Sequence, residues 1–211
     1  MNTAAPGLRV EKVHVWRGDR HVLRGVSLDL AAGELIHISG ANGAGKTTLL
    51  RVTTGLMRPE QGSVSWRGRS IVSTPAEYQA ELAYASHEPA LKGDLTALEN
   101  LRFMVGLKRR VNSNELLATL ERTGVAALAD LPTRVLSAGQ RRRVAMARVL
   151  AYRAVLWLLD EPFTNLDAAG SALMSSLLEE HVSQGGMVLV VAHHDLNLAV
   201  ATRRLELQGW A

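Results

Sequence analysis

The chain has 211 residues, of which 47% are hydrophobic and 21% charged, and this balance is typical of one globular domain with room for a proper core. It contains no cysteine, which excludes disulfides, thiolate nucleophiles and cysteine-based zinc sites. The formal net charge is +4, and because the basic runs are short, a solvated surface is favoured over a face for nucleic acid or an anionic membrane.

The start of the chain and its apolar runs bear on its location. Residues Met1 to Lys12 lack the basic-then-apolar pattern of a secretory signal. The apolar runs at 155–159 and 187–192 are far shorter than the ~18 residues that span a bilayer. We therefore expect a soluble protein that resides in the cytoplasm.

Strand-like and helix-like segments alternate along the chain. Strands are expected at 8–15, 22–30, 35–39, 62–66, 82–86, 155–159 and 188–192, the first two antiparallel around a turn at Gly18-Asp19. Helices are expected over 47–54, within 96–124 with one at about 115–122, from Ser137 to about Tyr152, over 168–182, and briefly from Asp195. This order predicts an α/β fold with a mainly parallel core sheet and N-terminal antiparallel strands.

The segment from Gly40 to Thr47 fits the pattern G-x-x-x-x-G-K-[ST], with an apolar strand before it and a helix after it. Glycines let the backbone turn its N–H groups toward an anion, and the N-terminus of the following helix adds positive potential. Lys46 can reach the β- and γ-phosphates, and the Thr47 hydroxyl can hold Mg²⁺. The pattern predicts a P-loop for a nucleoside triphosphate. The predicted binding residues are Gly40, Ala41, Asn42, Gly43, Ala44, Gly45, Lys46, Thr47 and Thr48.

Two carboxylates, Asp160 and Glu161, follow the apolar run at 156–159. A strand ending in this way places both at the carboxyl edge of the sheet, where the P-loop also lies. Asp160 is suited to hold Mg²⁺ through water, and Glu161 is suited to polarise the attacking water. An acidic pair can instead serve a turn or a cap, but downstream of a P-loop the catalytic interpretation is favoured. The pair therefore predicts hydrolysis as well as binding.

The start of the helix expected after Ser137 carries a family signature. Leu136 to Gln140 resembles the LSGGQ signature of ATP-binding cassette (ABC) ATPases, with Ala138 where the family usually has glycine. Ser137 and Gln140 also have the spacing of a helix capping box, and the two roles are compatible. The resemblance implies ATP and Mg²⁺ as ligands and a second copy packed head to tail. In such a dimer Ser137, Gly139 and Gln140 would face the γ-phosphate of the ATP that the other copy holds.

Further elements resemble those of the cassette family in order. Residues 164–167 resemble the D-loop that touches the partner copy, and Asp167 can also cap the next helix. His193 resembles the switch histidine that contacts the γ-phosphate, whereas His194 is expected to be a bystander. Trp16 stands at the place of the aromatic that stacks on adenine, and a core role is about equally compatible. His87 replaces a glutamine that coordinates Mg²⁺ and relays nucleotide state; it is an uncertain metal ligand, a better candidate for coupling, or a plain surface histidine.

The segments 87–89, 95–101, 136–140 and 160–164 together resemble the ATP-binding subunit of the haem exporter of bacterial cytochrome c maturation. The resemblance implies one ABC domain across 1–211, with a helical subdomain inserted at about 88–150. It also implies integral membrane partners, a peripheral position on the cytoplasmic face of the inner membrane, and ATP hydrolysis that powers haem export and release of the loaded haem chaperone. Direct binding of haem or nucleic acid is not expected.

Two alternatives stay open. The chain can belong to an exporter of drugs or lipids, because the membrane subunits choose the substrate. A non-transport ABC ATPase acting on DNA or ribosomes is disfavoured. The stretch between Lys46 and Ser137 is too short for a long coiled coil, and each motif occurs once.

Overall fold

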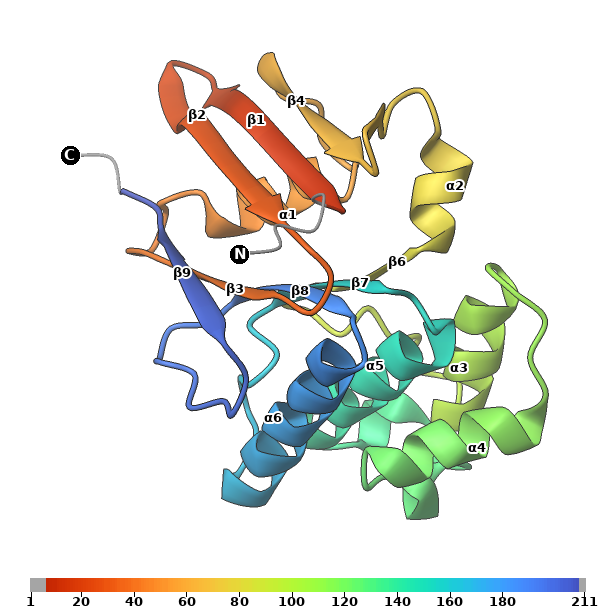
Figure 1. Cartoon of the computed structure of the whole chain (residues 1–211). Coiled ribbons are helices and arrows are strands. Elements are labelled where there is room, and N and C mark those ends of the chain that lie inside the picture. Colours follow the sequence, from red (N-terminus) through yellow and green to blue (C-terminus); the bar gives the residue numbers. More distant parts are fainter. Residues whose placement is uncertain (1–6, 209–211) are drawn as a thin grey trace.

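A five-stranded parallel sheet forms the middle layer of the computed structural model, which describes residues 7–208 (Figure 1). Residues 1–6 and 209–211, which include the first half of the Met1 to Lys12 stretch, lie outside the described part. The sheet has the order β6-β7-β8-β3-β9 and every pairing is parallel. Its strands are β3 (Leu35–Ser39), β6 (Leu82–Ala85), β7 (Leu156–Asp160), β8 (Met187–Val191) and β9 (Thr202–Glu206). All the carboxyl ends therefore meet at one edge.

An antiparallel sheet of order β2-β1-β4-β5 covers one face of the parallel sheet. Its strands are β1 (Leu8–Arg17), β2 (Arg20–Leu30), β4 (Gln61–Trp66) and β5 (Arg69–Ser70). Helix α1 (Lys46–Thr53) lies between the two sheets, because its buried Leu49 and Leu50 belong to the same hydrophobic cluster as Leu8 of β1 and Leu158 of β7. The short helix α2 (Pro75–Ala80) leads into β6. This layer positions the start of α1 beside the carboxyl edge.

Helices cover the other face of the parallel sheet. Helices α5 (Ala138–Tyr152) and α6 (Ala168–Ser183) pack there, since Val149 and Leu178 share a cluster with Leu159 of β7 and Val190 of β8. Helices α3 (Ala97–Gly106) and α4 (Ser113–Arg122) and the 3-10 turns Ala126–Leu128 and Thr133–Val135 complete this side. Helices α3 and α4 pack with α5 around a third hydrophobic cluster. The bounds 88–150 for a separate subdomain remain a prediction.

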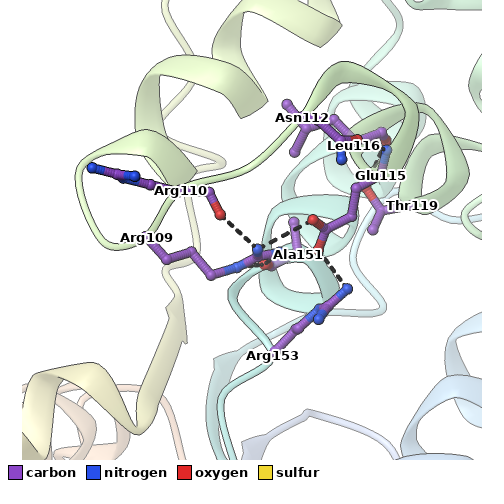
Figure 2. Close-up of polar contacts among 8 residues, drawn as sticks. All are labelled: Arg109, Arg110, Asn112, Glu115, Leu116, Thr119, Ala151 and Arg153. Atoms are coloured by element: carbon purple, nitrogen blue, oxygen red, sulfur yellow. Dashed lines mark hydrogen bonds and ion pairs between the residues drawn. The ribbon is translucent and has the colours of Figure 1, made fainter.

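A polar cluster ties α4 to the end of α5, as Figure 2 shows. The Glu115 carboxylate accepts hydrogen bonds from the guanidinium groups of Arg109 and Arg153, the latter at 2.8 Å. Arg109 Nε also donates to the Ala151 carbonyl at 2.8 Å. The hydrogen bond from Arg109, with the charges of Arg109 and Arg153, lowers the pKa of Glu115 although partial burial opposes this. The cluster anchors the segment between α3 and α4 against the rest of the helical layer.

The α/β class, the parallel sheet and the antiparallel N-terminal strands are confirmed, but the predicted helix from Asp195 is wrong. Residues 193–201 contain no helix, and the chain continues into β9 instead. Leu196, Leu198 and Val200 pack against the hydrophobic cluster that the parallel sheet shares with α5 and α6, while the residues between them are exposed, and this two-residue period is that of extended backbone. Packing against this cluster therefore outweighs the local helical pattern. Within residues 7–208, no helix combines the length and the apolar character needed to cross a bilayer.

Candidate active site

Four strand ends bring the predicted site residues together at the carboxyl edge of the parallel sheet. The P-loop follows β3, Asp160 ends β7 and is followed by Glu161, His193 lies two residues after β8, and His87 lies two residues after β6. Because these strands are neighbours in the order β6-β7-β8-β3, the residues converge without any long excursion of the chain.

The P-loop wraps around the start of α1. Gly45 caps the helix in the left-handed conformation at φ 98°, and a Cβ there would lie 2.7 Å from the side chain of Leu23, so the position requires glycine. Lys46 is buried and its Nζ donates hydrogen bonds to the carbonyls of Gly40 at 2.7 Å and Ala41 at 3.0 Å. No side chain caps the N-terminus of α1. The ammonium group and the first N–H groups of α1 therefore gather beside the loop.

The Asp160 carboxylate is almost fully buried, with 1% of the residue exposed. Neither carboxylate oxygen accepts a well-formed hydrogen bond from the residues that the structure describes. Burial raises the pKa of Asp160, and the Thr47 hydroxyl and the charges of His87 and Arg142 partly oppose this shift. A buried carboxylate without a full set of partners beside a threonine hydroxyl is a donor set that suits Mg²⁺. The residues present therefore fit the predicted metal.

Glu161 is held between two histidines. Its Oε1 lies 2.7 Å from His193 Nε2, and its Oε2 lies 3.4 Å from His87 Nδ1. The Thr164 hydroxyl donates to the same Oε2 at 3.2 Å. The backbone of Glu161 is left-handed at φ 54°, while its N–H donates to the Val191 carbonyl. The turn therefore directs the carboxylate away from β7 at a small cost in backbone strain.

Arg142, to which the sequence patterns assigned no role, links the helical layer to this edge. It is buried in α5, and its guanidinium donates to the carbonyls of Ser86, at 3.0 Å, and His87. Burial lowers the pKa of Arg142, and the carboxylates of Glu161 and Asp160 raise it. The guanidinium therefore positions the loop that carries His87. The available signal was the run 141–143, whose middle arginine faces inward.

The signature residues occupy the N-terminus of α5. Ser137 and Gln140 form the predicted capping box, with Gln140 N donating to Ser137 Oγ at 3.2 Å and Ser137 N donating to Gln140 Oε1 at 2.8 Å. Gly139 lies against the D-loop, because a Cβ there would lie 2.6 Å from the Asn165 carbonyl oxygen. Asp167 caps α6 through the Gly170 N–H as expected. The signature and the D-loop are therefore packed as one unit.

Substituting Gly139→Ala is expected to destabilise the fold by about 1–3 kcal/mol and to lower ATPase activity, because the added methyl group must displace the D-loop backbone. Urea unfolding and ATP turnover measure the two effects. The control is Ala138→Gly, since Ala138 is exposed and its loss should cost at most ~1 kcal/mol. Wild-type stability and turnover in Gly139→Ala would show that the close approach has no consequence.

Trp16 lies at the end of β1 and is half-buried. Its indole stacks on the imidazole of His21 with centroids 3.9 Å apart and an interplanar angle of 8°. It is not a member of the buried clusters that form the core within residues 7–208. The predicted contact with adenine remains a prediction. His194, the expected bystander, is exposed and contacts Phe163 edge-on.

Comparisons with known proteins agree with this geometry. A family model described as ABC transporter matches residues 23–164. The chain is 45% identical over 209 residues to the cytochrome c biogenesis ATP-binding export protein CcmA of Nitrosococcus oceani, covering 99% of this chain and 95% of the relative. It is 44% identical over 192 residues to the protein of the same name from Escherichia coli strain K12, covering 90% and 91%.

Solved structures give the same result. A dimeric bacterial ABC transporter cassette superimposes with a TM-score of 0.86 at 26% identity, covering 95% of this chain and 94% of that one. A second structure of the same cassette, a dimer in a post-hydrolysis state bound to ADP and Pi, has a TM-score of 0.80 at 26% identity and covers 91% of this chain and 90% of that one.

Proposed function

This chain belongs to the ABC transporter family of ATP-binding proteins, and from that membership we propose that it powers an export complex of cytochrome c biogenesis by hydrolysing ATP. The relatives it matches over nearly its whole length are named cytochrome c biogenesis ATP-binding export proteins. The observation that carries the proposed chemistry is the Glu161 carboxylate held at 2.7 Å from His193, at the same sheet edge as the P-loop.

The proposed reaction uses these residues in sequence. Lys46 and the N–H groups of the P-loop bind the phosphates of ATP and offset their negative charge. Mg²⁺, when bound at Thr47 and Asp160, would supply further charge neutralisation at the β- and γ-phosphates. Glu161 accepts a proton from the attacking water, whose oxygen forms the new bond to the γ-phosphorus as the bond to ADP breaks. His193 Nε2 contacts Glu161 in this structure, and with ATP bound we expect the same N–H to donate to the γ-phosphate instead. The products are ADP and phosphate.

We propose that the site is completed by a second copy of the chain. ABC cassettes form dimers, as the solved bacterial cassette does in both of its structures. In this chain the Ser137 and Gln140 side chains close a capping box on one another, and a helix N-terminus of this kind is suited to meet a γ-phosphate from outside. A head-to-tail pair would place Ser137, Gly139 and Gln140 of one copy over the P-loop of the other.

The export complex supplies the remaining partners. We propose that the chain binds integral membrane subunits at the cytoplasmic face of the bacterial inner membrane, and that hydrolysis drives haem export and release of the loaded haem chaperone. The helical layer is the part of the cassette suited to contact those subunits, since Arg142 connects it to the loop of His87 and hence to Glu161. Neither haem nor nucleic acid is assigned to this chain.

Mixing two inactive variants tests the composite site. Ser137→Arg should block the signature while leaving its own P-loop intact, and Lys46→Ala should disable the P-loop while leaving its own signature intact. Each variant alone is expected to have at most about 1% of wild-type turnover. A head-to-tail heterodimer contains one site with both halves intact and one with neither, so an equal mixture should regain up to about a quarter of wild-type turnover. The measurement is ATP turnover against mixing ratio at constant total protein.

A mixture that stays as inactive as its components would contradict the composite site. Normal turnover of Ser137→Arg alone would contradict it as well. Nucleotide binding by Ser137→Arg provides the control that its own P-loop is intact.

A further inference from the structure

Three aromatic rings form an ordered stack at the open end of the antiparallel sheet. The imidazoles of His14 and His21 lie side by side, with His14 Nδ1 3.1 Å from His21 Nε2 and an interplanar angle of 23°. The Trp16 indole lies parallel to both, at 3.9 Å and 8° from His21 and at 5.7 Å and 15° from His14. The hydrogen-bonded imidazoles therefore make a two-ring plate on which the indole rests.

The strand pairing explains this arrangement. His14 and Trp16 are two residues apart on β1, and the stacking of their rings shows that they share a face of the sheet across the local register shift. His21 on β2 is the direct cross-strand partner of Trp16. Glu60 holds the same segment of backbone from the other side: its carboxylate accepts from Trp16 N at 3.2 Å, and its own N–H donates to the His14 carbonyl at 3.0 Å. Stacking and the histidine hydrogen bond therefore hold the rings, and the two hydrogen bonds of Glu60 hold the β1 backbone that carries His14 and Trp16.

The His21 end of the stack lies next to the P-loop. A cavity of about 300 Å³ is lined by His21 together with Gly43 and Ala44 of the P-loop. Closer still, the Gly45 backbone approaches Val22, the residue after His21, so that a Cβ on Gly45 would lie 3.2 Å from the Val22 carbonyl oxygen. A nucleotide whose phosphates occupy the P-loop would therefore have its base within reach of these rings.

We propose that the hydrogen-bonded pair of His14 and His21 backs the Trp16 indole and holds it as the stacking surface for the base of the bound nucleotide, which makes His21 a positioning residue for nucleotide affinity. The proposal rests on the proposed binding of ATP at the P-loop. An indole has two faces and His21 covers one, so the base takes the other and completes a three-layer stack. Because the indole is already held in place, less side-chain conformational entropy is lost when the base binds.

The protonation state of the plate supports this role. Partial burial, followed by the charges of His14 and Arg24, lowers the pKa of His21, while a hydrogen bond to the backbone of Leu23 and the charge of Glu60 oppose the shift. The lowered pKa favours the neutral form of His21. At a separation of 3.1 Å, one ring nitrogen can donate its N–H to the lone pair of the other, and this hydrogen bond keeps the two rings side by side.

The test separates the base from the phosphates. The binding constants of ATP and of inorganic tripolyphosphate are measured by calorimetry on the full-length wild-type chain and on His21→Ala, His21→Phe and the control His194→Ala. His21→Ala is expected to bind ATP about tenfold more weakly and tripolyphosphate as wild type does. His21→Phe should restore ATP affinity, because a flat ring again backs the indole. In ATPase assays the effect should fall on KM rather than on kcat.

The outcomes that overturn the proposal are distinct. Wild-type ATP affinity in His21→Ala would show that the plate does not support base binding. Equal weakening of ATP and tripolyphosphate would show that His21 acts on the P-loop or on the fold instead, and failure of His21→Phe to restore affinity would exclude a stacking role. If the wild-type chain bound neither probe, the proposed function itself would be wrong.

Discussion

Replacing Glu161 with glutamine is expected to lower ATP turnover by at least about 100-fold while leaving ATP binding in place. Glutamine keeps the size of the side chain and can still contact His193, but it cannot accept the proton of the attacking water. The carboxylate it replaces lies 2.7 Å from His193 and 3.4 Å from His87, so its geometry is set before substrate arrives. Single-turnover hydrolysis measured together with the ATP dissociation constant separates chemistry from binding.

The same variant should accumulate as an ATP-bound dimer, because closure persists when hydrolysis stalls. Size-exclusion chromatography with and without ATP and Mg²⁺ measures this. The matched control is Glu88→Gln, which removes the same charge from an exposed residue of the loop that carries His87. Normal turnover by Glu161→Gln would show that Glu161 is not the catalytic base. The Asp160-Glu161 pair would then have only a structural role in the turn.

Lys46→Ala is expected to weaken ATP binding by about 3 kcal/mol, roughly 100-fold. Lys46 is the buried cation of the P-loop, and its Nζ already lies at hydrogen-bonding distance from the Gly40 and Ala41 carbonyls. Removing it leaves the phosphates without their main fixed positive charge, since the remaining contacts are backbone N–H groups. Calorimetry with ATP measures the loss directly.

The control for this substitution is Lys92→Ala, because Lys92 is exposed and its ammonium contacts the Phe103 ring instead of the P-loop. ATP affinity equal to wild type would refute the assignment of the P-loop.

The elements that could be predicted from sequence are those with a strong local or burial pattern. Strands β3, β7 and β8 are buried at every residue, and so their sequences are mostly apolar, with His37, Ser39 and Asp160 as the exceptions. The capping boxes at the starts of α3 and α5, headed by Thr96 and Ser137, were also readable, because both partners of each box lie within three residues.

The elements that could not be predicted depend on tertiary packing. Strand β9 lies at the sheet edge with mostly exposed residues, including Arg203 and Arg204, and therefore lacks an apolar signal. The helix α2 is only six residues long, too short for a periodic pattern. The segment after Asp195 has a helical pattern locally, but Leu196 and Leu198 pack without a helix against the cluster between the parallel sheet and helices α5 and α6.

The candidate site likewise has features that the sequence predicts and features that depend on tertiary packing. The motifs predicted which residues gather at the carboxyl edge, because each follows the end of a strand. They could not show that His87 and His193 contact the same carboxylate, since this depends on β6, β7 and β8 being consecutive in the sheet. The inward direction of Arg142 was equally hidden within a basic run. In place of the usual glutamine, His87 thus contacts Glu161, while its predicted part in metal binding stays a prediction.

Cells whose only copy of this chain carries Lys46→Ala test whether its ATP hydrolysis supports cytochrome c biogenesis. The measurement is the haem-stained profile of c-type cytochromes at matched levels of wild-type and variant protein. We expect loss of holo-cytochromes c with b-type cytochromes intact. An unchanged set of c-type cytochromes would contradict this expectation and would assign this ATPase to a different exporter.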